Sequence, residues 1–169
     1  MILGKYNTIK YNDVANAPGI AISIYLQGCP HHCKGCFNPE TWDFNGGQEL
    51  TEELLKDLFE NKINANGIKR SLCILGGEPL CEANETTTRT LALMAKKYNI
   101  NVYVWTGYVL EELEKTDLLF EIFENIDFLI DGPFIEEEKD LTLKMRGSRN
   151  QRVIDIKKYL TKDKNYVII

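Results

Sequence analysis

The sequence contains no apolar run long enough to span a bilayer. Its first residues, MILGKYNTIKYNDV, lack the basic head and apolar stretch of a secretory signal. We therefore expect a cytoplasmic protein that has no membrane partner. The sequence also lacks an excess of positive charge, because 20 Lys and Arg stand against 25 Asp and Glu. The net charge of −5 argues against a general nucleic-acid binder, although it still permits a local basic patch.

Internal repeats, low-complexity tracts and linkers rich in Pro, Gly or Ser are also missing, so we expect residues 1–169 to form a single domain. A chain of this length can bury a core without disulfide bonds. It has five cysteines, an odd number, and the absence of a secretory signal indicates a reducing compartment. Clustered thiols in such a compartment bind metal or carry out chemistry, so disulfides are the weakest interpretation.

Short apolar runs alternate with helical patterns along the chain. Runs typical of buried strands occupy residues 20–26, 71–75, 102–105 and 126–130. Helices are expected after Thr51, after Asn84 as a cap, and over residues 110–123. Residues 134–152 are polar and irregular, and residues 153–169 fit a strand or a helix. This alternation predicts an α/β fold with a mainly parallel sheet. A complete βα barrel needs roughly 250 residues, so the chain forms an incomplete, partial βα barrel or an open sheet.

Each expected strand runs into a turn of small or polar residues: Gly28-Cys29, Gly76 to Pro79, Thr106 to Tyr108, and Asp131 to Pro133. Ligands bind at this carboxyl edge of parallel sheets. Turns between strands and helices favour Gly, Pro and Asp in any case, so one such turn would mean little. Four of them, one with clustered cysteines, favour a shared active site.

Three of the five cysteines, Cys29, Cys33 and Cys36, lie within eight positions in the spacing C-x3-C-x2-C. Thiolates suit zinc and iron–sulfur clusters. Structural zinc takes four ligands, and His31 or His32 could complete a Cys3His site, although a closed site within one loop is cramped. A cubane cluster usually takes four cysteines. If three cysteines hold it, one iron stays open for a ligand or substrate.

Five motifs follow one another along the chain: GCPHHCKGCFNPETW, SLCILGGEPL, VYVWTGY, FLIDGPF and RGSRNQR. In content and order they resemble the radical S-adenosylmethionine superfamily. Within it, they are similar to the glycyl-radical activating enzymes that serve the anaerobic ribonucleoside-triphosphate reductase. The resemblance implies a [4Fe-4S] cluster on Cys29, Cys33 and Cys36, with S-adenosylmethionine as second cofactor. Gly35, Cys36 and Phe37 would lie along its adenine, although Phe37 fits ordinary core packing equally well. Gly76 and Gly77 would let the backbone approach its methionine end, since they have no Cβ. Glu78 and the neighbouring backbone would hold its ammonium group.

The resemblance also implies the reaction. S-adenosylmethionine would chelate the open iron, and one electron from the reduced cluster would release methionine and a 5′-deoxyadenosyl radical. This radical would take a hydrogen atom from a glycine Cα of the partner, the anaerobic ribonucleoside-triphosphate reductase. The electron would come from an external donor such as flavodoxin or ferredoxin. Relatives often have Gly-Pro-Gly-x-Arg before the first parallel strand, whereas this chain has Ala21 at the arginine position.

Two other functions remain open on the sequence. One is a small radical enzyme that acts on a small molecule, of the 7-carboxy-7-deazaguanine synthase type. The other is a zinc-bound interaction module without catalysis. The chain offers no extra domain, second cysteine cluster or long insertion to enclose a small substrate, and this favours a protein substrate.

Several further residues carry weaker expectations. Cys73 is expected to be a small buried hydrophobe, Cys81 to lie near the site without binding metal, and both histidines to lie on the loop surface. Trp105 fits a cofactor contact or core packing equally well, and Asp131 fits a turn residue or a polar anchor. The three arginines of RGSRNQR, at positions 146, 149 and 152, fit a solvated turn, a docking edge for the partner or a group that binds carboxylates.

Overall fold

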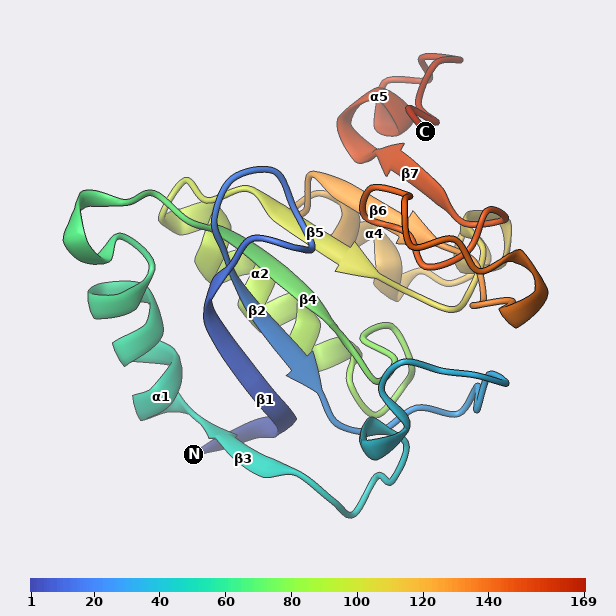
Figure 1. Cartoon of the computed structure of the whole chain (residues 1–169). Coiled ribbons are helices and arrows are strands. Elements are labelled where there is room, and N and C mark those ends of the chain that lie inside the picture. The colour runs from blue at the N-terminus through green and yellow to red at the C-terminus, as the bar shows by residue number, and fades with distance from the viewer.

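A computed structural model describes residues 1–169, apart from the side chains at positions 118 and 119. Its strands form one mixed sheet in the order β3-β1-β2-β4-β5-β6-β7 (Figure 1). The central strands β2 (Ala21–Leu26), β4 (Ser71–Gly76), β5 (Val102–Trp105) and β6 (Phe128–Asp131) run parallel. This confirms the predicted α/β class and the partial βα barrel with a mainly parallel sheet.

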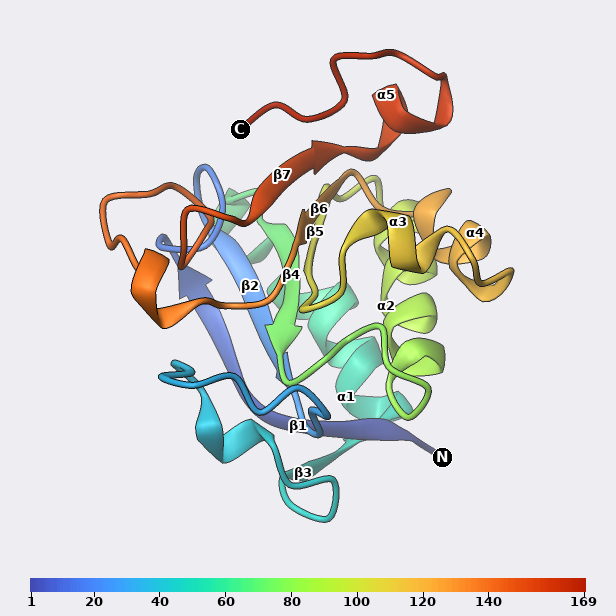
Figure 2. The same cartoon turned by 90° about the vertical axis from the view of Figure 1, so that its right-hand side faces the viewer.

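The parallel strands are apolar on both faces, which explains why they are continuous apolar runs in the sequence. Successive side chains of a strand point to opposite faces. Ile22 and Ile24 pack into the larger core together with residues of the helices, whereas Ala21, Tyr25 and Cys73 pack into a smaller cluster. Figure 2 shows helices α1 to α4 on one side of the sheet and the segment between β6 and β7 on the other.

The outer strands β1 (Ile2–Asp13), β3 (Gln48–Thr51) and β7 (Arg152–Asp155) are antiparallel to their neighbours. Strands β1 and β3 are not among the strands predicted from the sequence. Most of β1 is exposed or half-buried, and its register against β2 shifts between Tyr6 and Thr8, so a regular apolar alternation is missing. Residues 153–169, which fitted either a strand or a helix in the sequence, contain both. After β7 comes α5 (Ile156–Leu160), and Ile168 N then donates to Val153 O at 2.9 Å.

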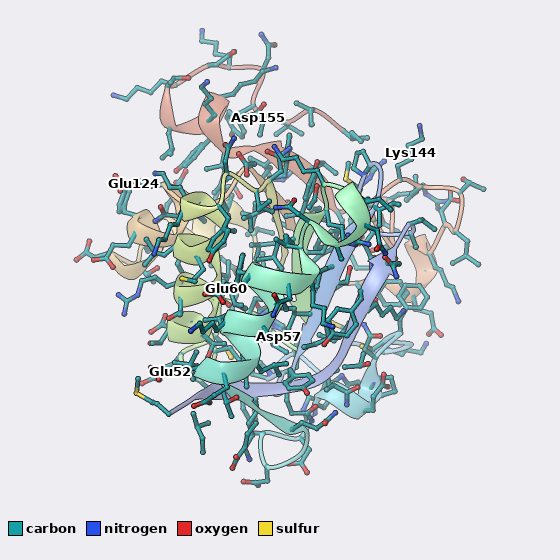
Figure 3. All side chains as sticks on the ribbon, turned by 90° about the vertical axis from the view of Figure 1, so that its left-hand side faces the viewer. Glu52, Asp57, Glu60, Glu124, Lys144 and Asp155 are labelled. Atoms are coloured by element: carbon teal, nitrogen blue, oxygen red, sulfur yellow. The ribbon has the colours of Figure 1, made fainter. Side chains whose placement is uncertain are left out.

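The helices begin near the predicted residues. Thr51 caps α1 (Glu52–Asp57), since its side chain accepts a hydrogen bond from Leu54 N at 3.2 Å. The helix continues as a wider π turn (Leu58–Lys62), and Glu52, Asp57 and Glu60 lie along the side that Figure 3 shows. A long helix, α2 (Glu85–Lys97), follows β4. None of the described helices has the length and apolar character that crossing a bilayer requires.

The single helix predicted over residues 110–123 is wrong. The structure has two short helices there, α3 (Leu110–Leu113) and α4 (Leu118–Phe123). Thr116 closes the first one, because its backbone N and its hydroxyl both donate to Leu113 O, at 3.1 and 3.0 Å. That carbonyl would otherwise accept the next bond of a continuing helix.

Candidate active site

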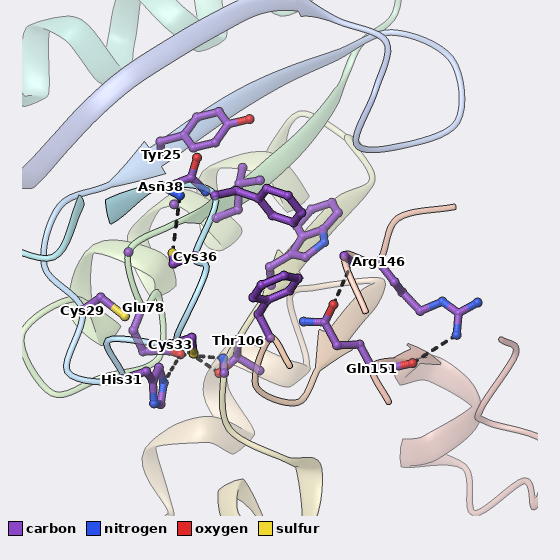
Figure 4. A pocket seen from close by; sticks show the side chains of 18 of the residues that line it. Tyr25, Cys29, His31, Cys33, Cys36, Asn38, Glu78, Thr106, Arg146 and Gln151 are labelled. Carbon is purple, nitrogen blue, oxygen red and sulfur yellow. Dashed lines mark hydrogen bonds and ion pairs between the residues drawn. The ribbon is translucent and has the colours of Figure 1, made fainter. Parts of the chain in front are cut away.

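A cavity of about 340 Å³ opens at the carboxyl ends of the parallel strands (Figure 4). This volume is near the lower end of the range for small-molecule sites, roughly 300 to 1,000 Å³. Residues from all four predicted turns line it. The structure therefore brings the four turns to one site, as expected for parallel strands. Among the lining residues are Cys29, Cys33, Cys36, Gly76, Gly77, Glu78, Phe37, Trp105, Thr106 and Gly132.

The three clustered cysteines lie on the loop that leaves β2. Gly28 starts this loop with a φ of +101°, and backbone bonds from Gly28 N to Thr41 O and from Cys29 N to Trp42 O tie down its root. All five cysteines of the chain are free thiols. Burial raises the pKa of Cys29 to about 11 and also raises the pKa of Cys33. Metal binding to these thiols would therefore release protons.

No three His, Cys, Asp or Glu side chains of the described part of the chain converge on a point that could hold a single metal ion. A cubane cluster makes a different demand, because each of its cysteines binds a separate iron. Cys29, Cys33 and Cys36 all line the cavity and equal in number the thiols that the predicted cluster would use.

Glu78 is at the centre of the site and is buried, with 1% of its side chain exposed. Its Oε1 atom accepts hydrogen bonds from Leu80 N at 2.9 Å and Thr106 Oγ1 at 2.8 Å. Its Oε2 atom accepts from Gly107 N at 2.7 Å and lies 2.6 Å from His31 Nε2. The carboxylate thus joins the turns after β4 and β5 to the cysteine loop.

The two histidines of the loop differ. His31 was expected on the loop surface, but its side chain is only 20% exposed, lines the cavity and reaches Glu78. The expectation fails because the buried carboxylate at position 78 attracts the imidazole. His32 is exposed, as predicted, and stacks on Trp42 with 4.5 Å between ring centroids.

Both glycines of the turn after β4 are required by the packing of the strand ends. Gly76 has a φ of +102°, and a Cβ there would lie 2.6 Å from Tyr25 Cα. A Cβ at Gly77 would lie 2.3 Å from Gly28 O. The reason predicted for these glycines is close approach of the backbone to the cofactor. The structure adds a reason that needs no cofactor, namely the contact between this turn and the root of the cysteine loop.

Of the three residues expected along the adenine, Cys36 and Phe37 line the cavity, and Gly35 adjoins Cys36. Gly35 has a φ of +71°, and a Cβ there would meet the side chain of Glu136 at 2.7 Å. Phe37 is 49% exposed, so it does not belong to the core. Its ring lies 4.9 Å from that of Phe134, centroid to centroid. The segment between β6 and β7 therefore packs against the cysteine loop and narrows the cavity.

Asn84 was expected to cap α2, but its side chain makes no capping bond. Instead its Nδ2 atom lies within 3.0 to 3.1 Å of the carbonyl oxygens of Gln27, Gly28 and Glu78. The expectation fails because these carbonyls, at the ends of two parallel strands, compete for the amide. Sequence reasoning missed this position because its partners are distant in the chain.

The three arginines of RGSRNQR have different surroundings, and their role in docking a partner stays a prediction. Arg152 binds Asp131 and Glu111. Arg149 is exposed. Arg146 borders the cavity, but its guanidinium points away from the thiols and donates to Gln151 O at 3.2 Å (Figure 4). Their contacts differ because Arg152 begins β7, whereas the other two belong to the preceding loop.

The structure also shows the surroundings of the other residues that carried weaker expectations. Asp131 accepts bonds from Arg152 and from Leu110 N, so it anchors β7 and the start of α3, and it is not among the residues that line the cavity. Trp105 lines the cavity, and its Nε1 atom donates to Met145 O at 2.7 Å. Cys73 is fully buried, as predicted, and burial raises its pKa to about 12. Cys81 is buried as well, and Ala21, at the position where relatives often have arginine, is fully buried at the start of β2.

Comparison with known proteins gives a consistent result. Residues 15–154 match the family model of a 4Fe-4S single cluster domain. A Vibrio cholerae protein named anaerobic ribonucleoside-triphosphate reductase-activating protein is 37% identical over 145 residues, 82% of this chain and 90% of the relative. Proteins of the same name from Escherichia coli K12 and Enterobacteria phage T4 are 35% and 32% identical, over 83% and 88% of this chain and 92% of each relative.

Proposed function

The chain belongs to the family of anaerobic ribonucleoside-triphosphate reductase-activating proteins, and we propose that it generates a glycyl radical on a reductase of that kind. The observation that carries this proposal is the cavity bordered by three free thiols at the carboxyl edge of the sheet, in a chain that matches a 4Fe-4S domain. The match to a 4Fe-4S domain disfavours a zinc module, and the names of the relatives disfavour an enzyme for small molecules.

Cys29, Cys33 and Cys36 would hold the cluster. The donor set fits, because three thiols on one loop leave one iron of a cubane without a protein ligand. The thiol of Cys73 lies in β4 and is fully buried, so it is no candidate. When bound, the reduced cluster and S-adenosylmethionine supply a 5′-deoxyadenosyl radical that removes a hydrogen atom from glycine.

The residues of this chain bind and shield that chemistry. We assign the methionine end of S-adenosylmethionine to the turn formed by Gly76, Gly77 and Glu78, and its adenine to Gly35, Cys36 and Phe37. Both groups of residues border the cavity or adjoin residues that do. The aromatic pair of Phe37 and Phe134 would exclude water from one side.

A protein substrate agrees with the form of the cavity. The sheet does not close into a barrel, and the cavity reaches the surface next to the half-exposed Phe37, so a glycine on a loop of the reductase could enter. We propose an external flavodoxin or ferredoxin as electron donor, since a single group of thiols faces the cavity within the described residues. We also propose a cytoplasmic location, which keeps these thiols reduced, and one functional domain over residues 1–169.

The test is to mix the anaerobically reconstituted protein with the cognate reductase, S-adenosylmethionine and a reductant, and to record electron paramagnetic resonance spectra. We expect the doublet of a glycyl radical, which should be missing when the Cys33→Ser variant replaces the wild type. A wild-type protein that carries the cluster and cleaves S-adenosylmethionine but yields no doublet would contradict the proposal.

A further inference from the structure

His31 connects the cysteine loop to the ends of two parallel strands. Its Nε2 atom lies 2.6 Å from Glu78 Oε2, just past β4. Its ring packs edge-on against Tyr108, just past β5, with 4.6 Å between centroids. Among the described contacts of the side chains at positions 30–37, the one to Glu78 is the hydrogen bond that reaches these strand ends. Backbone and Asn84 bonds hold the root of the loop at Gln27 and Gly28, and His31 adds a side-chain bond between the cysteine-bearing part of the loop and the Gly76–Glu78 turn.

The carboxylate that receives this bond has no free acceptor site. A carboxylate offers about four lone-pair sites. Two partners, Leu80 N and Thr106 Oγ1, bind the Oε1 atom of Glu78. Two others, Gly107 N and His31 Nε2, bind the Oε2 atom, so all four sites are occupied. A ligand ammonium group could reach this carboxylate only by displacing one of them.

The main chain of Glu78 is fixed too. Its N–H donates to Gly28 O at 2.9 Å, and its carbonyl accepts from Asn84 Nδ2 at 3.0 Å. Glu78 can therefore turn neither its side chain nor its backbone toward a ligand without breaking bonds. Glu78 therefore has a structural role in the site.

We propose that His31 is a positioning residue that holds the cysteine loop in register with the Gly76–Glu78 turn. In this proposal, which rests on the proposed function, the Glu78 carboxylate serves the bond to His31, and the ammonium group of S-adenosylmethionine is left to backbone carbonyls of the turn. The register matters because the cluster ligands and the cofactor turn belong to different elements. Their separation must stay constant within a fraction of an ångström for both to engage one ligand.

The chain offers a matched control for this inference. His32 is the neighbouring histidine, but it is exposed, stacks on Trp42 and makes no contact with Glu78. The variants are His31→Ala, which removes the bond, His31→Gln, which keeps a terminal N–H donor, and His32→Ala. Each is reconstituted anaerobically and assayed for iron and sulfide, and its affinity for S-adenosylmethionine is measured by titrating the paramagnetic resonance spectrum of the reduced cluster.

We expect His31→Ala to keep the iron content of the wild type, because all three thiols remain, and to bind S-adenosylmethionine on the order of tenfold more weakly. His31→Gln should recover most of the affinity, and His32→Ala should match the wild type. Unchanged affinity in His31→Ala overturns the inference. Equal losses in His31→Ala and His31→Gln also overturn it, because the hydrogen bond would then be irrelevant.

If His31→Ala assembles no cluster, the inference is tested by amide hydrogen exchange of the metal-free proteins. The inference requires faster amide exchange over residues 29–37 in His31→Ala than in His32→Ala, with β4 and β5 unchanged, and equal exchange overturns it. Failure of the proposed function looks different, because the wild type itself would then hold no cluster or show no spectral response to S-adenosylmethionine.

Discussion

Replacing Arg152 by Ala tests whether this arginine of the RGSRNQR motif stabilises the fold through its ion pair with Asp131. Arg152 Nε donates to Asp131 Oδ1 at 3.0 Å, and its two terminal nitrogens donate to the two carboxylate oxygens of Glu111 at 3.0 and 2.8 Å. Asp131 is buried, with 1% of its side chain exposed. The substitution would therefore leave a buried carboxylate without its cation.

The expected loss of stability follows from these contacts. Removing one partner of a buried ion pair costs about 3 to 5 kcal/mol. The lower end applies here, because Arg152 is 29% exposed and water can enter its place, and because Leu110 N still donates to Asp131 at 2.8 Å. Glu111 is largely exposed and adds at most about 1 kcal/mol. A loss of about 3 kcal/mol lowers the melting temperature by roughly 6 to 12 °C in a chain of this size.

The assay is urea and thermal unfolding of the metal-free protein under reducing conditions. Arg149→Ala is the matched control, since Arg149 comes from the same motif and is exposed, and it should change stability by less than about 0.5 kcal/mol. Adding Asp131→Asn to Arg152→Ala should restore part of the loss, because the amide carries no charge and can still accept from Leu110 N. If Arg152→Ala unfolds like Arg149→Ala, the ion pair does not stabilise the fold and our reasoning is wrong.

Three further predictions concern the thiols, the turn after β4 and a half-buried acid. Changing Cys29, Cys33 or Cys36 to Ser should each abolish cubane assembly, whereas Cys73→Ala should preserve it; full iron content in Cys33→Ser would refute the ligand assignment. Gly77→Ala should lower the unfolding free energy of the metal-free protein by about 1 to 3 kcal/mol, because the new Cβ would lie 2.3 Å from Gly28 O. Unchanged stability with weakened S-adenosylmethionine binding would instead support cofactor approach as the sole reason for that glycine. Burial raises the pKa of Asp127 in the folded protein, so the native state retains this proton to higher pH than the unfolded chain, and stability falls as pH rises through that window. Asp127→Asn should therefore stabilise the protein at pH 7 and have little effect below the ordinary pKa of aspartate, which pH-dependent urea unfolding can check; equal effects at both pH values would contradict this sign.

The parallel strands could be predicted because burial on both faces leaves continuous apolar runs, such as residues 20–26 and 71–75. The antiparallel strands β1 and β3 could not. Only part of β1 is buried, and its register shift near Asn7 removes the alternation that would have marked it. The break between α3 and α4 was also missed, since it depends on one carbonyl that Thr116 occupies.

The parts of the site that consist of consecutive residues could be predicted. The cysteine loop and the Gly76–Glu78 turn are each contained in a few consecutive residues, so their spacing can be recognised without a fold. The bond between His31 and Glu78 joins positions 47 residues apart, and no local pattern encodes it. The arginines show the same dependence on the fold, because the start of β7 directs Arg152 toward Asp131 and the sequence does not tell which arginine of RGSRNQR binds a carboxylate.

The same bonds that satisfy buried polar groups at the strand ends also set the geometry of the site. The carboxyl ends of parallel strands leave carbonyls that the sheet does not pair, and an unpaired buried carbonyl is costly. Asn84 Nδ2 donates to the carbonyls of Gln27 and Glu78 and also lies within 3.1 Å of Gly28 O, which accepts from Glu78 N as well, so its two N–H groups are shared among three carbonyls. The carbonyls of Gln27 and Gly28 belong to the root of the cysteine loop, and that of Glu78 belongs to the neighbouring turn. Because one amide binds all three, the loop and the turn cannot separate without exposing buried polar groups, so the stability of this edge and the register of the two cofactor-binding segments depend on the same contacts.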